Sequence, residues 1–431
     1  MSVAWYEERL WQPSDEGLLA RRDRQAGTYR AYVPDPLGVD LPQVGPGAQQ
    51  AAEDALAVLA RADERIGPRG SYLNHLLIRS ESISSSWIEG NRITPKKLAI
   101  AETLESGTRT ALDVVATVHA TEQAIDSLAD RSRPITTPDI VDLQHTIEPR
   151  LPAGLRTEQN WVGGPGWSPL RADFVPPPES EVPALVADLA LFLTATHGNP
   201  VVRAAIAHAQ FETIHPFVDG NGRTGRALIH TVLRRCDALR HTLIPISTVF
   251  AARTDLYLAG LTSYRDPEPQ IDEWVIGFAQ AAEQAAQTGV KLARDAAALD
   301  EQLLQRLVEH RRRQGISPAL PRRGAVALKI LADLPIHPVV TTESAATRYD
   351  VSAVAAHRAL AELSDAGVLG RSKNHKGKIV CYTADAHLGL TALAERANRV
   401  GAGDTDHRRP DQGPPAPSVD HLGRLRTDAP E

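Results

Sequence analysis

Apolar residues recur at helical spacing along most of this chain. Two such helical faces lie near the middle of the chain, one on each side of residues 215–226. The first contains Val202, Ala205, Ile206 and Ala209, and the second contains Leu228, Ile229, Val232, Leu233 and Cys236. Repeats of three and four residues place these side chains on one face of an α-helix. The pattern therefore predicts a mainly α protein, with strands confined to a short β-hairpin and a C-terminal α+β module.

Breaks in the pattern divide the chain into six segments. Residues 1–48 are mixed in character, 49–134 form successive helices, 135–282 form a helical core, 283–317 form a linking helix, 318–392 form the α+β module, and 393–431 form a tail. From about residue 401 the tail is rich in Gly, Pro, Asp and Arg and lacks apolar periodicity, so we expect it to be disordered.

The 318–392 segment resembles a winged helix-turn-helix. Its pattern predicts helices near 325–333, 343–349 and 353–366, the last capped by Ser352, and then strands at 368–369 and 379–383. The predicted wing and third helix carry the basic residues Arg371, Lys373, Lys376 and Lys378, then His357 and Arg358. Wing cations suit DNA phosphates. The third helix is rich in alanine, however, and winged domains also bind proteins, so both partners stay open.

Composition narrows the setting. Hydrophobic residues make up 42% and charged residues 23% of the chain, as in ordinary globular proteins, and the net charge of −6 gives no general reason to expect nucleic acid. Cys236 and Cys381 lie far apart, which fits a reduced, cytoplasmic setting. No apolar run reaches the length of a membrane span, so we expect no signal peptide and no membrane partner.

Residues 215–226, His-Pro-Phe-Val-Asp-Gly-Asn-Gly-Arg-Thr-Gly-Arg, link the two central helices and carry the densest chemistry. Gly220, Asn221 and Gly222 can adopt positive φ, and the glycines allow a ligand close to the backbone. Amide groups in such a loop, at the start of a helix, bind phosphate. The sequence therefore predicts an anion site here.

Four side chains of the same stretch add to this prediction. Arg223 and Arg226 share the first turn of the second helix, where the helix dipole disfavours a cation and a bound anion reverses that effect. His215 ends the first helix, and its neutral imidazole can accept a proton. Asp219 offers a hard oxygen that suits Mg²⁺ beside phosphates. A helix-capping His215 and a turn-forming Asp219 are the plainer alternatives.

The stretch resembles the core motif of the Fic (Fic/DOC) family, His-X-Phe-X-(Asp/Glu)-Gly-Asn-Gly-Arg-X-X-Arg, at every fixed position. Most such proteins are adenylyltransferases that move AMP from ATP to a Ser, Thr or Tyr hydroxyl of a protein. The resemblance implies that His215 deprotonates this hydroxyl and that Asp219 holds Mg²⁺. The nucleotide-binding residues that it implies are Gly220, Asn221, Gly222, Arg223 and Arg226.

A second motif lies upstream. Ser85-X-X-X-Glu89-Gly90 resembles the inhibitory motif of the same family, with Ser85 and Glu89 one turn apart and Gly90 ending the helix. The resemblance implies a bidentate pair between Glu89 and Arg226, at the place of the γ-phosphate. Inhibition would then act in cis. In some relatives the same glutamate positions water for AMP removal, so a de-AMPylase at this site stays open.

Residues 154–178 predict an irregular segment with a short hairpin. Within it, residues 171–176 resemble the flap of the family, whose edge can pair with an extended target segment. Tyr257 is assigned to the nucleotide pocket, with core packing as an equal alternative for it and for Tyr264. Residues 29–37 resemble the segment that precedes many Fic cores.

A reading from another class also stays open, in which the chain is an ATP-sensing, DNA-binding transcriptional regulator. The intact His215 favours an enzyme, because a sensor needs no base. The resemblance further implies self-modification and pairing into a homodimer, but no residue specifies either.

Overall fold

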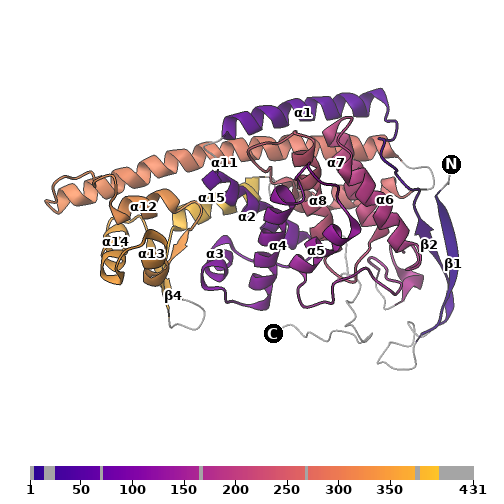
Figure 1. Cartoon of the computed structure of the whole chain (residues 1–431), viewed down its shortest axis with the longest axis horizontal. Helices are drawn as coiled ribbons and strands as arrows, with labels where there is room; N and C mark the ends of the chain where they lie inside the picture. Colours follow the sequence, from indigo (N-terminus) through magenta and orange to yellow (C-terminus); the bar gives the residue numbers. More distant parts are fainter. Residues whose placement is uncertain are drawn as a thin grey trace, which may run out of the picture.

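Two long helices, α1 (Pro46–Ile66) and α11 (Ile271–Arg313), run side by side along the molecule (Figure 1). The computed structural model describes residues 4–13, 25–67, 71–164, 168–266, 270–373 and 379–397. Small residues of α1 such as Ala48, Ala52 and Ala55 are completely buried, so α1 can pack closely along the N-terminal half of α11.

Helix α11 is continuous and runs through the predicted boundary at residue 282. No proline interrupts residues 271–313, and straight-chain helix formers are frequent there. Its first half buries Trp274 and Phe278 in the core, whereas Leu303 and Leu307 in its second half pack against the C-terminal module. One helix therefore joins the two parts of the molecule, where we expected a separate linking helix.

The helical core segment and the segment before it are built from shorter helices packed beside α1 and α11 (Figure 1). Their bounds are α2 (Ser71–Ile88), α3 (Pro95–Leu104), α4 (Arg109–Asp126), α5 (Thr137–Ile147), α6 (Val182–Thr194), α7 (Pro200–Ile214), α8 (Asn221–Arg235), α9 (Ile246–Ala252) and α10 (Thr254–Tyr264). Every residue of α7 is buried, and α7 packs against α8. These two helices therefore form the centre of the core, and the loop between them is held from both ends.

The N-terminal segment forms a two-stranded antiparallel ribbon that the sequence did not reveal. Strand β1 (Trp5–Trp11) pairs with β2 (Gly27–Val33), and the backbone N–H of Tyr32 in β2 donates to the carbonyl of Val175 at 3.0 Å. Trp11 also packs edge-on against Trp161. The ribbon is thus attached to the 154–178 segment.

That segment differs from the hairpin that we expected. A single antiparallel bridge joins Val162 and Phe174. Between these two residues in the sequence lies a short 3₁₀ helix, η3 (Pro169–Arg171). The positive φ of Gly163 and Gly164, at 67° and 85°, turns the chain directly after Val162 and prevents a longer ladder. Residues 165–167 lie outside the described part of the chain.

The C-terminal module has the order helix, strand, helix, helix, strand, strand, helix. Its elements are α12 (Val326–Asp333), β3 (Val339–Val340), α13 (Thr342–Tyr349), α14 (Ala353–Asp365), β4 (Gly370–Lys373), β5 (Val380–Thr383) and α15 (Asp385–Ala397), and the antiparallel sheet has the order β3-β5-β4. The sequence analysis did not predict β3. The strand that it predicted at residues 368–369 lies directly before β4, which begins at Gly370. Helix α15 crosses the predicted boundary at residue 392.

The module rests on α2 and α3. Arg79 of α2 is 4% exposed, and its guanidinium donates to the carboxylate of Glu102 at 2.8 Å and to the carbonyls of Pro335 at 3.1 Å and Ile336 at 2.6 Å. Ala99 of α3 packs against Val339 nearby. The segment 334–340 of the module is therefore fixed to the helix that carries Ser85.

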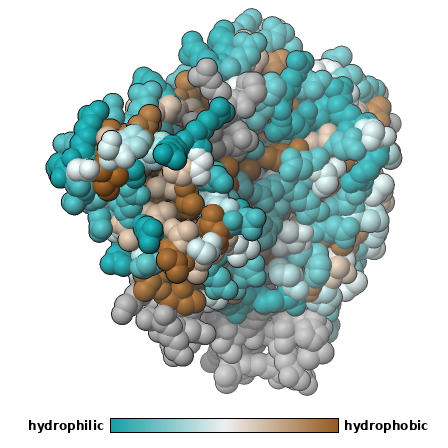
Figure 2. All heavy atoms as spheres, turned by 60° about the vertical axis from the view of Figure 1, so that its left-hand side comes forward, coloured by the Kyte–Doolittle hydropathy of each residue, from teal (hydrophilic) through white to brown (hydrophobic). Residues whose placement is uncertain are grey.

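The outer surface is mixed in character. Figure 2 turns the side with the C-terminal module forward, and this face is mainly hydrophilic, with hydrophobic side chains in a few patches. Among the described residues, no helix is both long enough and apolar enough to cross a membrane. The predicted wing residues 374–378 and the predicted tail from 401 lie outside the described part of the chain.

Candidate functional site

The loop between α7 and α8 turns through two left-handed residues. His215 has φ 49° and ends α7, with its N–H donating to the carbonyl of Phe211 at 2.9 Å. Gly220 has φ 81° and precedes α8, where a glycine avoids the strain of a Cβ. Asn221 and Gly222 are already helical, so positive φ is limited to Gly220 in the predicted trio.

Asn221 fixes the shape of this loop. Its amide oxygen accepts from the N–H of Phe217 at 2.9 Å, and its amide nitrogen donates to the carbonyl of Phe217 at 2.8 Å. Phe217 is 1% exposed and packs in the core, as its apolar ring predicts. With both amide atoms engaged, Asn221 shapes the backbone of the loop between α7 and α8 from inside.

Two residues that the sequence analysis missed hold the loop at His215. The guanidinium of Arg156 donates to the carbonyl of His215 at 3.0 Å, and the Arg156 backbone N–H donates to the carbonyl of Pro216 at 2.9 Å. Asn160 donates to the carbonyl of Phe217 at 3.1 Å. Both come from the 154–178 segment, which therefore orients the histidine.

His215 is a neutral imidazole in this environment. Burial, together with the charges of Arg265 and Arg156, lowers its pKa to about 3. Its Nδ1 atom is buried and has no hydrogen-bond partner in the part of the chain that the structure describes. A neutral ring nitrogen is the form that accepts a proton from a hydroxyl group.

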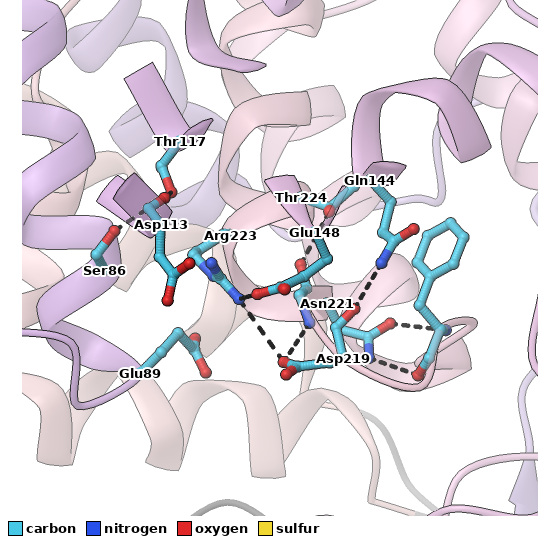
Figure 3. Close-up of polar contacts among 12 residues, drawn as sticks. Ser86, Glu89, Asp113, Thr117, Gln144, Glu148, Asp219, Asn221, Arg223 and Thr224 are labelled. Carbon is cyan, nitrogen blue, oxygen red and sulfur yellow. Dashed lines mark hydrogen bonds and ion pairs between the residues drawn. The ribbon is translucent and has the colours of Figure 1, made fainter. Parts of the chain in front are cut away.

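Asp219 lies at the turn, with its carboxylate near the start of α8 (Figure 3). Its Oδ1 accepts from the N–H of Gly220 at 2.6 Å and lies 3.7 Å from the Arg223 guanidinium, while Gln144 of α5 donates to its carbonyl at 2.9 Å. Burial raises the pKa of Asp219, against the effect of Arg223. These contacts aim the carboxylate at the side of the loop that Glu89 also faces.

Asp219 and its surroundings fit a magnesium ion whose other ligands come mainly from a bound nucleotide. Within the described residues there is no cluster of three or more side chains able to hold a metal. Mg²⁺ bound to nucleotides usually takes one or two carboxylates, with phosphates and waters completing its shell. Asp219 supplies such a carboxylate, and its second oxygen accepts no hydrogen bond among those found in the described chain.

Arg223 is held by a carboxylate that the sequence analysis did not single out. Glu148 Oε1 accepts from the Arg223 guanidinium at 2.6 Å, and both side chains are at most 4% exposed. The Nε and Nη1 groups of Arg223 are buried without a partner among the described residues. Buried N–H groups are normally satisfied, so these two are available to an anionic ligand.

Arg226 is held by the helix that carries the upstream motif. Its Nε donates to Ser85 Oγ at 2.9 Å, and one terminal nitrogen donates to the Ser85 carbonyl at 2.9 Å and to Glu89 Oε1 at 2.7 Å. The Glu89 contact is a single hydrogen bond, which corrects the expected bidentate pair, because Ser85 takes the other edge of the guanidinium. A Cβ at Gly222 would collide with Glu89 Oε1, so only glycine allows this approach.

Tyr257, which the sequence analysis assigned to the nucleotide pocket, lies in the hydrophobic core. It is 5% exposed, its ring stacks on Phe250 at 4.5 Å between centroids, and its hydroxyl lies 2.9 Å from His208 Nε2. Tyr264 is also buried, with its hydroxyl donating to Gln210 at 3.0 Å. Both tyrosines therefore pack in the core against α7.

The comparisons with known proteins agree with the motif. Residues 134–233 match the model of the Fic/DOC family. A protein adenylyltransferase Fic of Drosophila ananassae is 28% identical over 234 residues, which cover 52% of this chain and 43% of that protein. The protein of the same name from Drosophila virilis is 29% identical over 244 residues, which cover 54% and 45%. The chain thus spans less than half the length of these relatives.

Solved structures give a weaker likeness. A Fic family protein from Desulfovibrio desulfuricans aligns over 80% of this chain and 97% of its own, with 20% identity and a TM-score of 0.47. A Fic domain containing signaling protein from Bacteroides thetaiotaomicron aligns over 57% and 98%, with 19% identity and a TM-score of 0.47.

Proposed function

We propose that this chain, which carries a Fic/DOC family domain at residues 134–233, is a protein adenylyltransferase that Glu89 inhibits in cis. The observation that carries the proposal is the anion site at the start of α8. There the buried Arg223 has two N–H groups without a partner among the described residues, and Glu89 covers the glycine backbone beside Arg226. A polyphosphate satisfies such groups.

His215 acts as the general base in this proposal. It accepts the proton of a target hydroxyl, and the hydroxyl oxygen then bonds to the α-phosphorus of ATP. The bond from this phosphorus to the oxygen that bridges to the β-phosphate breaks, and pyrophosphate leaves. Arg156 and Asn160 support this role because they hold the backbone of the loop that orients the ring.

The charged residues hold the nucleotide in place. Arg223, held by Glu148, supplies its free N–H groups to the phosphates, and Arg226 reaches the terminal phosphate. Asp219 would hold Mg²⁺, which when bound supplies positive charge next to the phosphates. Positioning and charge stabilisation of this kind account for most of the catalysis in phosphoryl transfer.

Inhibition follows from the Glu89 contact. A carboxylate bonded to Arg226 at 2.7 Å occupies the position that the terminal phosphate needs, and it adds a negative charge beside it. ATP then binds without its terminal phosphate on Arg226. Removal of the Glu89 carboxylate opens the position without any change to His215.

The test uses the full chain with ATP labelled at either the α- or the γ-phosphate, in the presence of Mg²⁺ and a cell lysate as the source of targets. We expect Glu89→Gly to transfer the α-label to protein, the parent to transfer little, and Glu89→Gly/His215→Ala to transfer none. Glu105→Gly is the matched control, because Glu105 is exposed and has φ 46°, where glycine is tolerated.

Two results would contradict the proposal. Transfer of the γ-label would make the chain a kinase, and equal transfer by parent and Glu89→Gly would remove the inhibitory role. Loss of the α-label from previously modified protein, dependent on Glu89, would instead identify removal of AMP as the activity of the site.

We further propose that the C-terminal module is a winged helix-turn-helix that contacts DNA through α14. Its element order supports this, and His357 and Arg358 on α14 are exposed. Lys376 and Lys378 lie outside the described residues. Anisotropy of a labelled DNA duplex should show binding that weakens with salt and weakens further in Arg358→Ala. Salt-independent or absent binding would favour a protein partner, for which Val354, 69% exposed, offers an apolar contact.

A further inference from the structure

A buried carboxyl group without an assigned role lies beside the site. Glu212 is on α7, one turn before His215, and is 6% exposed. Its Oε1 atom has no hydrogen-bond partner among the described residues. It lies 2.5 Å from the position of a Cβ on Gly225, so it rests against the second turn of α8, at the residue before Arg226. Burial of such a group without a hydrogen bond is costly and calls for a reason.

Arg226 is a buried cation that depends on one carboxylate for its counter-charge. It is 1% exposed, and Glu89 is the only carboxylate paired with it among the described residues. Glu89 is itself 29% exposed and follows the end of α2, directly before the positive-φ Gly90. If Glu89 moves away, the buried Arg226 loses its counter-charge, and an unpaired buried cation is strongly unfavourable.

We propose that Glu212 is the positioning residue for Arg226: it is neutral while Glu89 or a nucleotide pairs with Arg226, and it becomes the ionised partner when both are absent. The inference rests on the proposed function. It assigns the proton of Glu212 to solvent when Glu89 leaves, and back to Glu212 when a triphosphate arrives. No covalent bond changes in either step.

The groups around Glu212 support this exchange. Burial raises the pKa of Glu212 to about 7, the charge of Arg226 opposes that rise, Glu89 adds to it, and Arg265 opposes it. Loss of the Glu89 charge therefore lowers the pKa of Glu212, and the charge of a terminal phosphate raises it again.

The remaining neighbours stay neutral near pH 7. Burial lowers the pKa of His208 to about 3, and His215 has a similarly low pKa, so neither ring is charged. Burial raises the pKa of Tyr257, so its hydroxyl keeps its proton. Glu212 is therefore the group in this cluster that can exchange a proton when the partner of Arg226 changes.

Proton uptake on nucleotide binding tests the proposal. The probe is an ATP analogue with a non-cleavable α,β bond, bound with Mg²⁺ to the full chain and measured by calorimetry in buffers of different ionisation enthalpy. At a pH near 7, Glu89→Gly should take up more protons than Glu89→Gly/Glu212→Gln, by up to about one per site. Glu89→Gly/Glu212→Asp, which keeps a carboxyl group, should retain the uptake.

A second readout is the pH dependence of the KM for ATP. In Glu89→Gly it should rise with pH, relative to the Glu212→Gln double variant, with a limiting slope of about tenfold per pH unit. Equal proton uptake and parallel KM profiles in the two variants would overturn the proposal, since a purely structural Glu212 moves neither.

The outcomes separate the two proposals. Binding of the analogue needs no turnover, so proton uptake remains measurable if AMP transfer fails. AMP transfer by Glu89→Gly with no excess proton uptake would leave the proposed function standing and remove the role of Glu212. Thermal unfolding of each variant checks that the fold is intact.

Discussion

The Glu89 carboxylate, directly after the end of α2, accepts a single hydrogen bond at 2.7 Å from Arg226 in the second turn of α8. The same guanidinium donates two more hydrogen bonds to Ser85, which lies one turn earlier on α2. The position of Arg226 therefore depends on the whole last turn of α2. Inhibition in the proposed enzyme is correspondingly a property of that turn.

Replacement of Ser85 by alanine should partly relieve inhibition. The change removes the hydroxyl that accepts from Arg226 Nε at 2.9 Å but keeps Glu89 and the Ser85 carbonyl. A hydrogen bond to a charged group contributes about 1.5–3 kcal/mol, so AMP transfer should rise above that of the parent and stay below that of Glu89→Gly. Initial rates of α-label incorporation measure this. The neighbouring Ser86→Ala, which loses a 3.4 Å contact with Thr117, serves as control.

Replacement of Asn221 by alanine should destabilise the anion loop. It leaves the buried N–H of Phe217 without its side-chain partner, at a cost of about 1–3 kcal/mol, while the Phe217 carbonyl keeps only the hydrogen bond from Asn160. Urea unfolding measures the loss, and nucleotide affinity should fall with it. Asn199→Ala, which removes the cap of α7, should cost about 1 kcal/mol without a comparable loss of affinity. Equal effects of the two variants on affinity would contradict the role given to Asn221.

Local features of the site could be predicted because a few consecutive residues determine them. His215 ends its helix and Gly220 takes positive φ, since both follow from the spacing of apolar positions and the placement of glycine. Glu148 could not be predicted, because it lies 75 residues before its partner Arg223 and nothing in its neighbours marks it. Packing of α5 against α8 brings the two together.

The same distinction applies to the fold. Most helices have strong periodicity, whereas β1 and β2 pair across an intervening segment of fifteen residues, so no short turn signal reveals the ribbon. The predicted boundary at residue 282 falls within α11, because a change of packing partner along that helix leaves the helical pattern intact. The Glu212 carboxyl gave no signal either, since a glutamate within a helix is ordinarily exposed.

Replacement of Arg79 by alanine should loosen the C-terminal module from α2. Three hydrogen bonds are lost, and Glu102 keeps a partly buried charge, so the contact should weaken by about 3–5 kcal/mol. Hydrogen exchange should then speed up in residues 334–340. Lys96→Ala removes an exposed pair with Asp385 in the same interface, which is worth about 0–1 kcal/mol, and should leave exchange nearly unchanged. Unaltered exchange in Arg79→Ala would show that other contacts hold the module.

Replacement of Glu212 by glutamine should stabilise the protein at alkaline pH and not at acidic pH. The pKa of Glu212 is about 7 in the folded protein, compared with 4.5 for a glutamate in the unfolded chain. The folded state therefore holds the proton more tightly. Below pH 4.5 both states are protonated and the parent keeps its full stability. As pH rises from 4.5 through 7, the unfolded chain loses its proton first and the parent loses up to about 3 kcal/mol, which the glutamine variant does not lose.

Urea unfolding at pH 5 and pH 8 measures this difference. The gain of Glu212→Gln over the parent should grow between the two values, and the exposed control Glu53→Gln should show no such growth. A gain of equal size at both pH values would mean that Glu212 has an ordinary pKa in the folded protein. In that case the carboxylate would already be ionised beside Arg226 while Glu89 is paired, and departure of Glu89 would need no loss of a proton.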